Sequence, residues 1–209
     1  MAVADRPMRA DAQRNREQLL AAAVAAFSRE DASEVTLESV AKAAGVGIGT
    51  LYRHFPSREA LVDAAYRSEL ARLCDSVPDL LAAMPADKAM RTWMDLFIEY
   101  MTTKKGMSDA LRMVIASGGN PFAESRGRLL AAFSALLAAG AAGGTLRADL
   151  DPADLLAGMS GVSLVAATPA QREQAGRLLD LLMDGLRYGA MKTAMRSRPQ
   201  AHYPRAGDG

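Results

Sequence analysis

The chain has 209 residues, 50% of them hydrophobic, and a formal net charge of +1 at pH 7. A hydrophobic content this high excludes an intrinsically disordered chain, and the length is sufficient for one large or two modest domains with a sizeable core. The single cysteine, Cys74, excludes an internal disulfide and suits a reducing compartment.

Two further features concern location and fold class. The chain opens without a charged segment followed by an apolar one, so we expect no secretory signal. The most apolar stretch, 155–167, is too short to span a membrane and contains two glycines. Segments rich in alanine and leucine, without alternation of polar and apolar residues, predict an all-α fold. We therefore expect a cytoplasmic, all-helical protein.

The N-terminal part of the chain predicts an arm followed by a helix. Residues 1–10 lack periodicity and are expected to form a flexible arm. The next segment, from about 11 to 29, carries Leu20, Val24 and Phe27 on one helical face. This helix is expected to pack across the elements that follow it.

The most informative stretch runs from 36 to 61. Thr36 is suited to cap a helix, and Gly45 can end that helix in the left-handed conformation without steric cost. A second short helix should stop at Phe55, because the residue before Pro56 is disfavoured in the helical region. Two short helices joined by a tight glycine turn form a helix-turn-helix. From spacing alone, a plain helical hairpin within a core is the alternative.

The remaining chain contains clear helix signals. Ser57 is expected to cap a long helix, and Pro78 to mark its end. Lys104 and Lys105 suit a helix C-terminus because they complement the helix dipole. Asn120 is expected to cap a helix with Pro121 in its first turn. The further expected helices are 87–106, 107–116, 121 to about 140, 151–167 and 169–189.

Three segments of the stretch 36–61 resemble the DNA-binding domain of the TetR/AcrR family of bacterial transcriptional regulators. They are VAKAAGV at 40–46, GTLYRHF at 49–55 and SREAL at 57–61. The resemblance extends from near Arg14 to near Leu73 and includes the family signature Gly-x-x-x-Gly-Thr-Leu-Tyr-x-His-Phe at 45–55. It implies an N-terminal three-helix helix-turn-helix DNA-binding domain and a C-terminal helical ligand-binding and dimerisation domain. The expected division is an arm at 1–10, a DNA-binding domain at 11–73, a regulatory and dimerisation domain at 76–190, and a disordered tail at 191–209.

The resemblance also implies which residues contact DNA, since it places the start of the recognition helix, 47–55, in the major groove. The candidate DNA-binding residues are Thr36, Gly47, Ile48, Gly49, Thr50, Tyr52, Arg53, His54 and Arg58. Ile48 is suited to a thymine methyl group and Thr50 to a base edge or a phosphate. For Tyr52, a core aromatic with its hydroxyl at the rim is the alternative to a phosphate contact. The net charge of residues 1–60 gives no support to DNA binding, because this segment holds eight basic and eight acidic side chains.

An enzyme is not expected. The two histidines, His54 and His202, are far apart in sequence, and no His/Cys/Asp/Glu cluster has metal-ligand spacing. No nucleophile elbow, P-loop or dinucleotide fingerprint occurs in the sequence. We therefore expect no catalytic residues, no metal and no cofactor.

Two further sites follow from the resemblance. A small-molecule effector is expected among the helices of the second domain, although an apolar stripe at helical spacing usually belongs simply to a core. The candidate lining residues are Trp93, Phe97, Tyr100, Met101, Met113 and Phe133. A homodimer is expected through the last two helices, although their small residues would also allow close packing within one chain. The candidate interface residues are Leu155, Gly158, Gly161, Val165, Leu178, Leu182 and Leu186.

The sequence therefore indicates a DNA-binding transcriptional regulator. We expect a homodimeric repressor that a small apolar or amphipathic ligand releases from a double-stranded operator. The alternatives are a regulator of the same fold without a small-molecule effector and a helical interaction protein that has lost DNA binding.

Overall fold

The computed structural model describes residues 5–28, 34–166 and 169–188, without the side chains of 5–9 and 169–170, and these ranges contain helices and no β-strand. The helices are α1 (Asp5–Phe27), α2 (Leu37–Ala43), α3 (Ile48–His54), α4 (Arg58–Asp75), α5 (Val77–Ala83), α6 (Ala86–Gly106), α7 (Ser108–Ala116), α8 (Ser125–Ala142), α9 (Pro152–Ser163) and α10 (Pro169–Arg187). The expected all-α fold is confirmed for this part of the chain. None of the described helices is long and apolar enough to cross a membrane.

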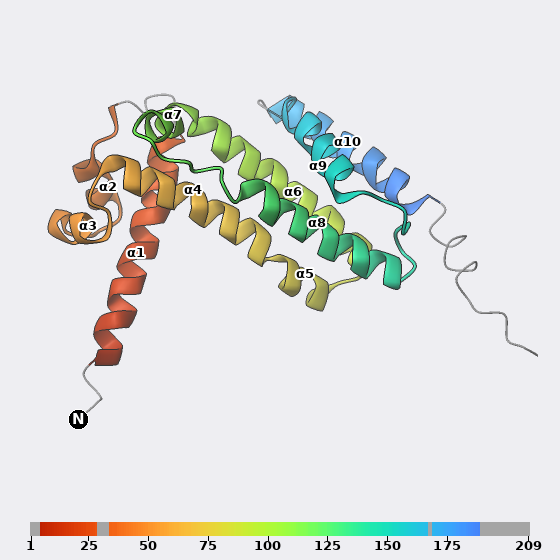
Figure 1. Ribbon diagram of the computed structural model, residues 1–209, viewed down its shortest axis with the longest axis horizontal. Coiled ribbons are helices and arrows are strands. Elements are labelled where there is room, and N and C mark those ends of the chain that lie inside the picture. The colour runs from red at the N-terminus through yellow and green to blue at the C-terminus, as the bar shows by residue number, and fades with distance from the viewer. Residues whose placement is uncertain (1–4, 29–33, 167–168, 189–209) are drawn as a thin grey trace, which may run out of the picture.

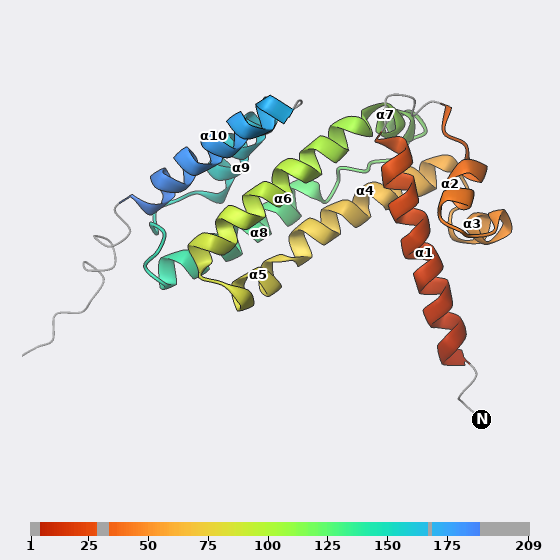
Figure 2. The ribbon, with the colours of Figure 1, turned by 180° about the vertical axis from the view of Figure 1, so that it is seen from behind.

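The helices form an elongated molecule with two distinct ends. Helices α4, α6 and α8 run side by side through its middle, and α9 and α10 cover one side of this layer (Figure 1). Helix α1 crosses α4 and projects away from the layer, while α2 and α3 lie at the opposite end from α10, as both views show (Figure 2). Helix α4 packs against α1 and also against α6, α7 and α8, so it joins the two ends.

The core of the α1–α3 end follows from helical periodicity. Leu19, Ala23 and Phe27 are each four residues apart on α1, and all three are completely buried. They belong to the same hydrophobic core as Val40 of α2 and Leu51 of α3. These two short helices are therefore stabilised mainly by packing, because isolated helices of this length are unstable in water.

The core of the other end is aromatic. Trp93 of α6 is completely buried, and its indole N–H donates to the carbonyl oxygen of Leu73 in α4 at 2.9 Å. The Trp93 ring packs edge-on against Phe133 of α8, with centroids 4.7 Å apart, and lies 5.9 Å from the ring of Phe97. One tryptophan thus connects three helices of the central layer.

Several local expectations are confirmed. Helix α6 ends at Gly106, and α7 ends just before the segment 117–119. Asp151 caps α9 by accepting a hydrogen bond from the amide of Ala153 at 2.7 Å.

Other expected boundaries were wrong. Helix α1 begins at Asp5, so part of the expected arm 1–10 is helical. The helix end expected at Pro78 comes three residues earlier, at Asp75, and Pro78 itself lies in the first turn of α5, where a proline removes no intrahelical hydrogen bond. Helix α9 ends at Ser163 instead of 167. The expected tail, 191–209, lies outside the described residues.

The start of α8 was also predicted incorrectly. Residues 121–124 form turns, and α8 begins only at Ser125. The ring of Phe122 packs edge-on against Tyr66 of α4, with centroids 5.3 Å apart. This tertiary contact outweighs the local signal of an asparagine followed by a proline.

Candidate nucleic-acid interface and adjoining cavity

The first helix of the motif is fixed by its cap. The Thr36 hydroxyl accepts a hydrogen bond from the amide of Ser39 at 3.1 Å, and the Ser39 hydroxyl donates to the Thr36 carbonyl at 2.8 Å. This arrangement satisfies an amide that the helix leaves without a partner. The predicted cap of α2 is therefore confirmed.

The turn between α2 and α3 depends on one glycine. Gly45 has a φ of +68°, which L-residues with a side chain rarely adopt. Its amide donates to the Lys42 carbonyl at 3.1 Å, and the next amide, that of Val46, donates to Ala41 at 2.9 Å. These bonds close the end of α2 and direct the chain into α3.

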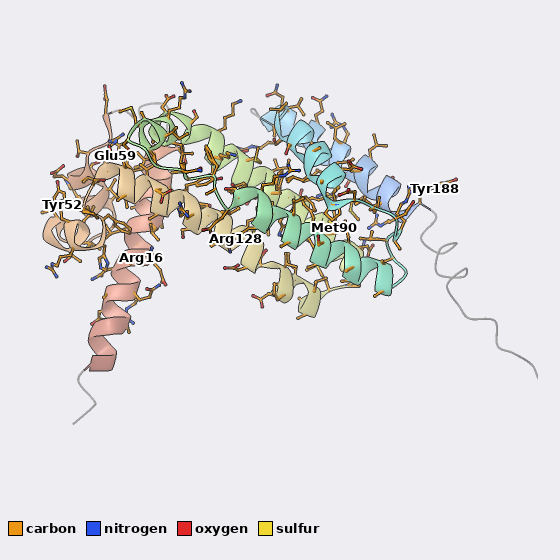
Figure 3. All side chains as sticks on the ribbon, viewed as in Figure 1. Arg16, Tyr52, Glu59, Met90, Arg128 and Tyr188 are labelled. Carbon is orange, nitrogen blue, oxygen red and sulfur yellow. The ribbon has the colours of Figure 1, made fainter. Side chains whose placement is uncertain are left out.

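Helix α3 has one buried and one exposed face. Leu51 is completely buried, and Phe55, directly after the helix, is 3% exposed. On the other face, Ile48 is 38% exposed and Tyr52, one turn later, is 47% exposed. Tyr52 projects from α3 at the end of the molecule opposite Tyr188 (Figure 3). The alternative of a core aromatic therefore does not describe Tyr52.

The other candidate DNA-binding residues divide by exposure. Thr36, Gly47, Gly49 and Arg53 are exposed, whereas Thr50, His54 and Arg58 are half-buried. A Cβ atom built on Gly47 or Gly49 would meet no atom within 4 Å. Packing within the described chain therefore does not require a glycine at either position.

Arg58 is engaged inside the protein. Its guanidinium group donates to the Val35 carbonyl and lies over the Phe27 ring, 4.7 Å from the centroid. Arg16 makes a similar contact with Phe55, at 5.6 Å. Both arginines thus hold α1 against the motif, and this positioning role is the one that the geometry gives to Arg58.

Two adjoining cavities open near the end of α6. The first, of about 340 Å³, lies among α6, α7 and the end of α9, and the second, of about 360 Å³, among α6, α8 and α9. Both are lined by Met101, Lys104 and Phe122, and we call them together the Lys104 cavity. The other lining residues are Lys105, Ser108, Leu111, Arg112, Ile115, Ser163 and Leu164 in the first, and Phe97, Tyr100, Ser125, Arg126, Leu129, Ala153, Leu156, Ala157 and Ser160 in the second.

A buried hydrogen-bond network connects this cavity to α4. The Tyr66 hydroxyl lies 2.6 Å from the Tyr100 hydroxyl and 2.9 Å from Ser125 Oγ. Burial, followed by the contact with Tyr66, raises the pKa of Tyr100 well above its ordinary value. The Tyr100 hydroxyl therefore stays protonated and can act as a hydrogen-bond donor.

Lys104 is half-buried in this cavity. Its Nζ lies 4.6 Å from the centroid of the Phe122 ring, and in the described part of the chain no carboxylate lies within ion-pair distance of it. Burial lowers the pKa of Lys104. The sequence indicated only a lysine that complements a helix end, because local spacing does not show that its side chain is enclosed.

Comparison with known proteins assigns the family. Residues 19–65 match the family described as "Bacterial regulatory proteins, tetR family", and residues 85–188 match "Transcriptional regulator SbtR-like, C-terminal domain". The structure of the TetR transcriptional regulator SCO0520 from Streptomyces coelicolor is 54% identical, with 82% of this chain and 98% of that chain covered and a TM-score of 0.78. The chain belongs to the TetR family.

Other relatives agree with this assignment. A TetR regulator from Mycobacterium vanbaalenii is 33% identical over 87% of this chain and 99% of that chain, with a TM-score of 0.71. An HTH-type transcriptional regulator from Staphylococcus aureus is 35% identical over 78 residues, which are 37% of this chain and 41% of that protein. The TetR-family protein is thus a helix-turn-helix transcriptional regulator, with a C-terminal helical domain; proteins of this family are regulators and not enzymes.

The residues predicted to bind a ligand do not form one site. Trp93 and Phe133 are completely buried in the aromatic core and are not among the residues that line the Lys104 cavity. Met113 is 60% exposed on α7. Of the six predicted residues, only Phe97, Tyr100 and Met101 line the cavity.

The residues predicted at the dimer interface also differ in how far they are exposed. Leu155 and Leu186 are 6% and 5% exposed in the single chain, so packing within the subunit already covers them. Gly158 and Gly161 are exposed, whereas Val165, Leu178 and Leu182 are half-buried. Sequence spacing did not single out three strongly exposed apolar residues at this end: Leu164, Leu181 and Tyr188, at 78%, 69% and 76%.

Proposed function

We propose that this TetR-family protein is a homodimeric repressor that acts in the bacterial cytoplasm. Helix α3 of each subunit would enter the major groove of an operator, and a small molecule in the Lys104 cavity would release the DNA. The proposed DNA-binding domain is 11–73 and the proposed regulatory domain is 76–190. The exposed face of α3 is the single observation that carries the proposal.

That face is suited to contact DNA. Ile48 and Tyr52 lie on the same exposed side of α3, and Arg53 follows them, while Leu51 and Phe55 fix the helix from behind. An exposed isoleucine can contact a thymine methyl group, a tyrosine hydroxyl can donate to a phosphate, and an arginine can neutralise one. Since packing does not explain Gly47 and Gly49, we attribute both glycines to close approach of the backbone to DNA.

A dimer is needed because one short helix reads too few base pairs for useful specificity. A surface for it lies at α9 and α10, since Leu164, directly after α9, and Leu181 of α10 are strongly exposed there. Exposed apolar residues that gather on neighbouring elements are typical of protein interfaces. We therefore assign the dimer interface to the outer faces of α9 and α10.

Release of DNA would be a shift between two domain orientations. Helix α4 belongs to both parts of the chain: it packs against α1, and its Tyr66 bonds Tyr100 and Ser125, which line the Lys104 cavity. A ligand that fits only one arrangement of this network favours one position of α4. The two recognition helices of the dimer would then no longer match successive major grooves.

The test compares two exposed tyrosines. Fluorescence anisotropy of the DNA upstream of the protein's own gene would measure binding by the wild type, Tyr52→Ala and Tyr188→Ala. Tyr188 is the matched control for DNA contact, because it is also exposed but lies at the far end of the molecule. We expect Tyr52→Ala to weaken binding about tenfold, as loss of a hydrogen bond to a charged group does, and Tyr188→Ala to retain wild-type affinity at a saturating dimer concentration. Equal affinity of Tyr52→Ala and wild type would contradict the docking of α3.

A further inference from the structure

We propose that the ligand of the Lys104 cavity is a single-chain amphiphile whose anionic head group binds Lys104. Its apolar chain would lie against the apolar walls of the same cavity. This inference rests on the proposed function in one respect, namely that a ligand in this cavity controls DNA binding.

The charges around the cavity select an anion. Four basic side chains line it, those of Lys104, Lys105, Arg112 and Arg126, and no carboxylate is among its described lining residues. Arg112 forms an exposed ion pair with Asp109 at 2.9 Å, so part of its charge is already compensated. The other three basic groups have no ion pair with the described residues. A cationic ligand would be repelled here, and an anionic one attracted.

Lys104 is the basic group best placed to bind the head group. The side chains of Lys105 and Arg126 are less enclosed, whereas Lys104 lines both cavities and lies over the Phe122 ring at 4.6 Å. A half-buried ammonium group loses hydration without gaining a carboxylate partner, and the lowered pKa of Lys104 reflects this loss. An anion at this point would restore the missing interaction.

The remainder of the cavity selects an apolar chain. Met101, Leu111 and Ile115 line the first part, and Ile115 is 48% exposed. Covering such exposed apolar surface is favourable, at about 25 cal/mol for each Å² removed from water. The volumes of about 340 and 360 Å³ are typical of small-ligand sites and too small for a folded partner.

The experiment holds the apolar chain constant and changes the head group. Calorimetry on the full-length protein would compare decanoate, decyl sulfate, decanol and decyltrimethylammonium, all below the concentrations at which they aggregate. We expect both anions to bind, and decanol and the cation to bind at least about tenfold more weakly, as loss of a charge-assisted hydrogen bond predicts. Stronger binding of decanoate than of decyl sulfate would identify a carboxylate as the head group, and the reverse order a tetrahedral anion. Equal or tighter binding of decanol or the cation, or no binding of either anion, would overturn the inference.

Variants locate the head group. Lys104→Met keeps an unbranched side chain without the charge and should weaken decanoate binding at least about tenfold, whereas Lys104→Arg should retain most of the affinity. Lys88→Met is the matched control, since Lys88 is exposed near the other end of α6. The thermal midpoint of each variant would show that it folds, and Lys104→Met should not lower this midpoint, because it removes a half-buried charge. Unchanged decanoate affinity in folded Lys104→Met would overturn the role of Lys104.

Failure of this inference can be told apart from failure of the proposed function. If decanoate binds in a Lys104-dependent way but does not release operator DNA, the ligand class stands and control of DNA binding fails. If decanol or the cation releases the DNA instead, control by the cavity stands and the anionic ligand class fails.

Discussion

Burial changes the chemistry of two residues whose sequence context is ordinary. Lys104 and Cys74 both lie near the end of a helix, and local spacing gives neither a special role. Burial lowers the pKa of the Lys104 ammonium group and raises the pKa of the Cys74 thiol, because in each case the charged form loses hydration. For Cys74 the consequence is low reactivity. For Lys104 the loss of hydration, together with its place in the cavity, supports the proposed anionic ligand.

The reactivity of Cys74 gives a pH-dependent prediction. Burial is the largest effect on this thiol and raises its pKa from 9.0 to about 11, although Arg128 nearby acts in the opposite direction. Since the thiolate is the nucleophile, iodoacetamide should alkylate the native protein at pH 8 about a hundredfold more slowly than free cysteine. The rate should continue to rise above pH 9 and should reach the free-cysteine value when urea unfolds the chain. A native rate that levels off near pH 9 would contradict a raised pKa.

At the scale of elements, the end of α6 lies directly against the end of α1. A Cβ atom on Gly106 would lie 2.6 Å from the backbone carbonyl oxygen of Ser28, and backbone cannot move aside as a flexible side chain can. Gly106 follows Lys104 by two residues, so the helix that carries the proposed ligand contact also touches the scaffold of the DNA-binding motif. We infer that a ligand at Lys104 can act on α1 as well as on α4.

This close contact predicts the effect of an added methyl group. Gly106→Ala should lower the free energy of unfolding by about 1–3 kcal/mol, because the helices must separate to admit the methyl group. Gly127→Ala in α8 is the control, since a Cβ atom there would meet no atom within 4 Å, and better helix propensity should leave stability equal or higher by up to about 1 kcal/mol. Urea denaturation measures both. Equal stability of the two variants would show that α6 and α1 are not in close contact.

The tyrosine network predicts coupling between α4 and α6. Tyr66→Phe leaves the Tyr100 and Ser125 hydroxyl groups without their shared partner and should cost about 1–3 kcal/mol of stability. In a double-mutant cycle with Tyr100→Phe, the two effects should be non-additive by at least about 0.5 kcal/mol, because the hydroxyl groups interact directly. Additive effects in urea denaturation would remove this network from the proposed path between the cavity and α4.

The scale of elements also shows what the sequence could and could not predict. The caps at Thr36, Ser57 and Asp151 and the turn at Gly45 were predictable, since each depends on the residue and its immediate neighbours. Which apolar side chains enclose a cavity depends instead on how distant helices meet. In the sequence, Trp93 therefore looks like a ligand-site residue, because it is an apolar side chain at helical spacing, although in the structure it belongs to the core.

The same distinction holds on the DNA-binding surface. The spacing of Leu51 and Phe55 correctly indicated the buried side of α3, and this left Tyr52 on the other side. The engagement of Arg58 with Val35 and Phe27 could not be predicted, because these partners come from a loop and from α1.

At the scale of the whole molecule, the proposed dimer depends on the end opposite the DNA-binding motif. Sedimentation of the wild type should give a mass near twice 22.2 kDa. Leu181→Glu should dissociate the dimer, because it places a charge within an apolar interface, whereas Met113→Glu on α7 should not, although Met113 is similarly exposed. A monomeric wild type at micromolar concentration, or a dimer that persists in Leu181→Glu, would contradict the assignment of α9 and α10 to the interface.

The most direct test of operator recognition by α3 is the salt dependence of DNA binding. Anisotropy titrations of the upstream DNA with wild type and Arg53→Ala would be carried out over a range of salt concentrations, with Lys88→Ala as the control that removes one charge elsewhere. The logarithm of the wild-type affinity should fall linearly with the logarithm of salt concentration, and Arg53→Ala should reduce the slope by about 1 for each subunit of the dimer. Lys88→Ala should keep the wild-type slope. Operator recognition by α3 would be contradicted by identical slopes for wild type and Arg53→Ala, or by no binding of the upstream DNA at any salt concentration.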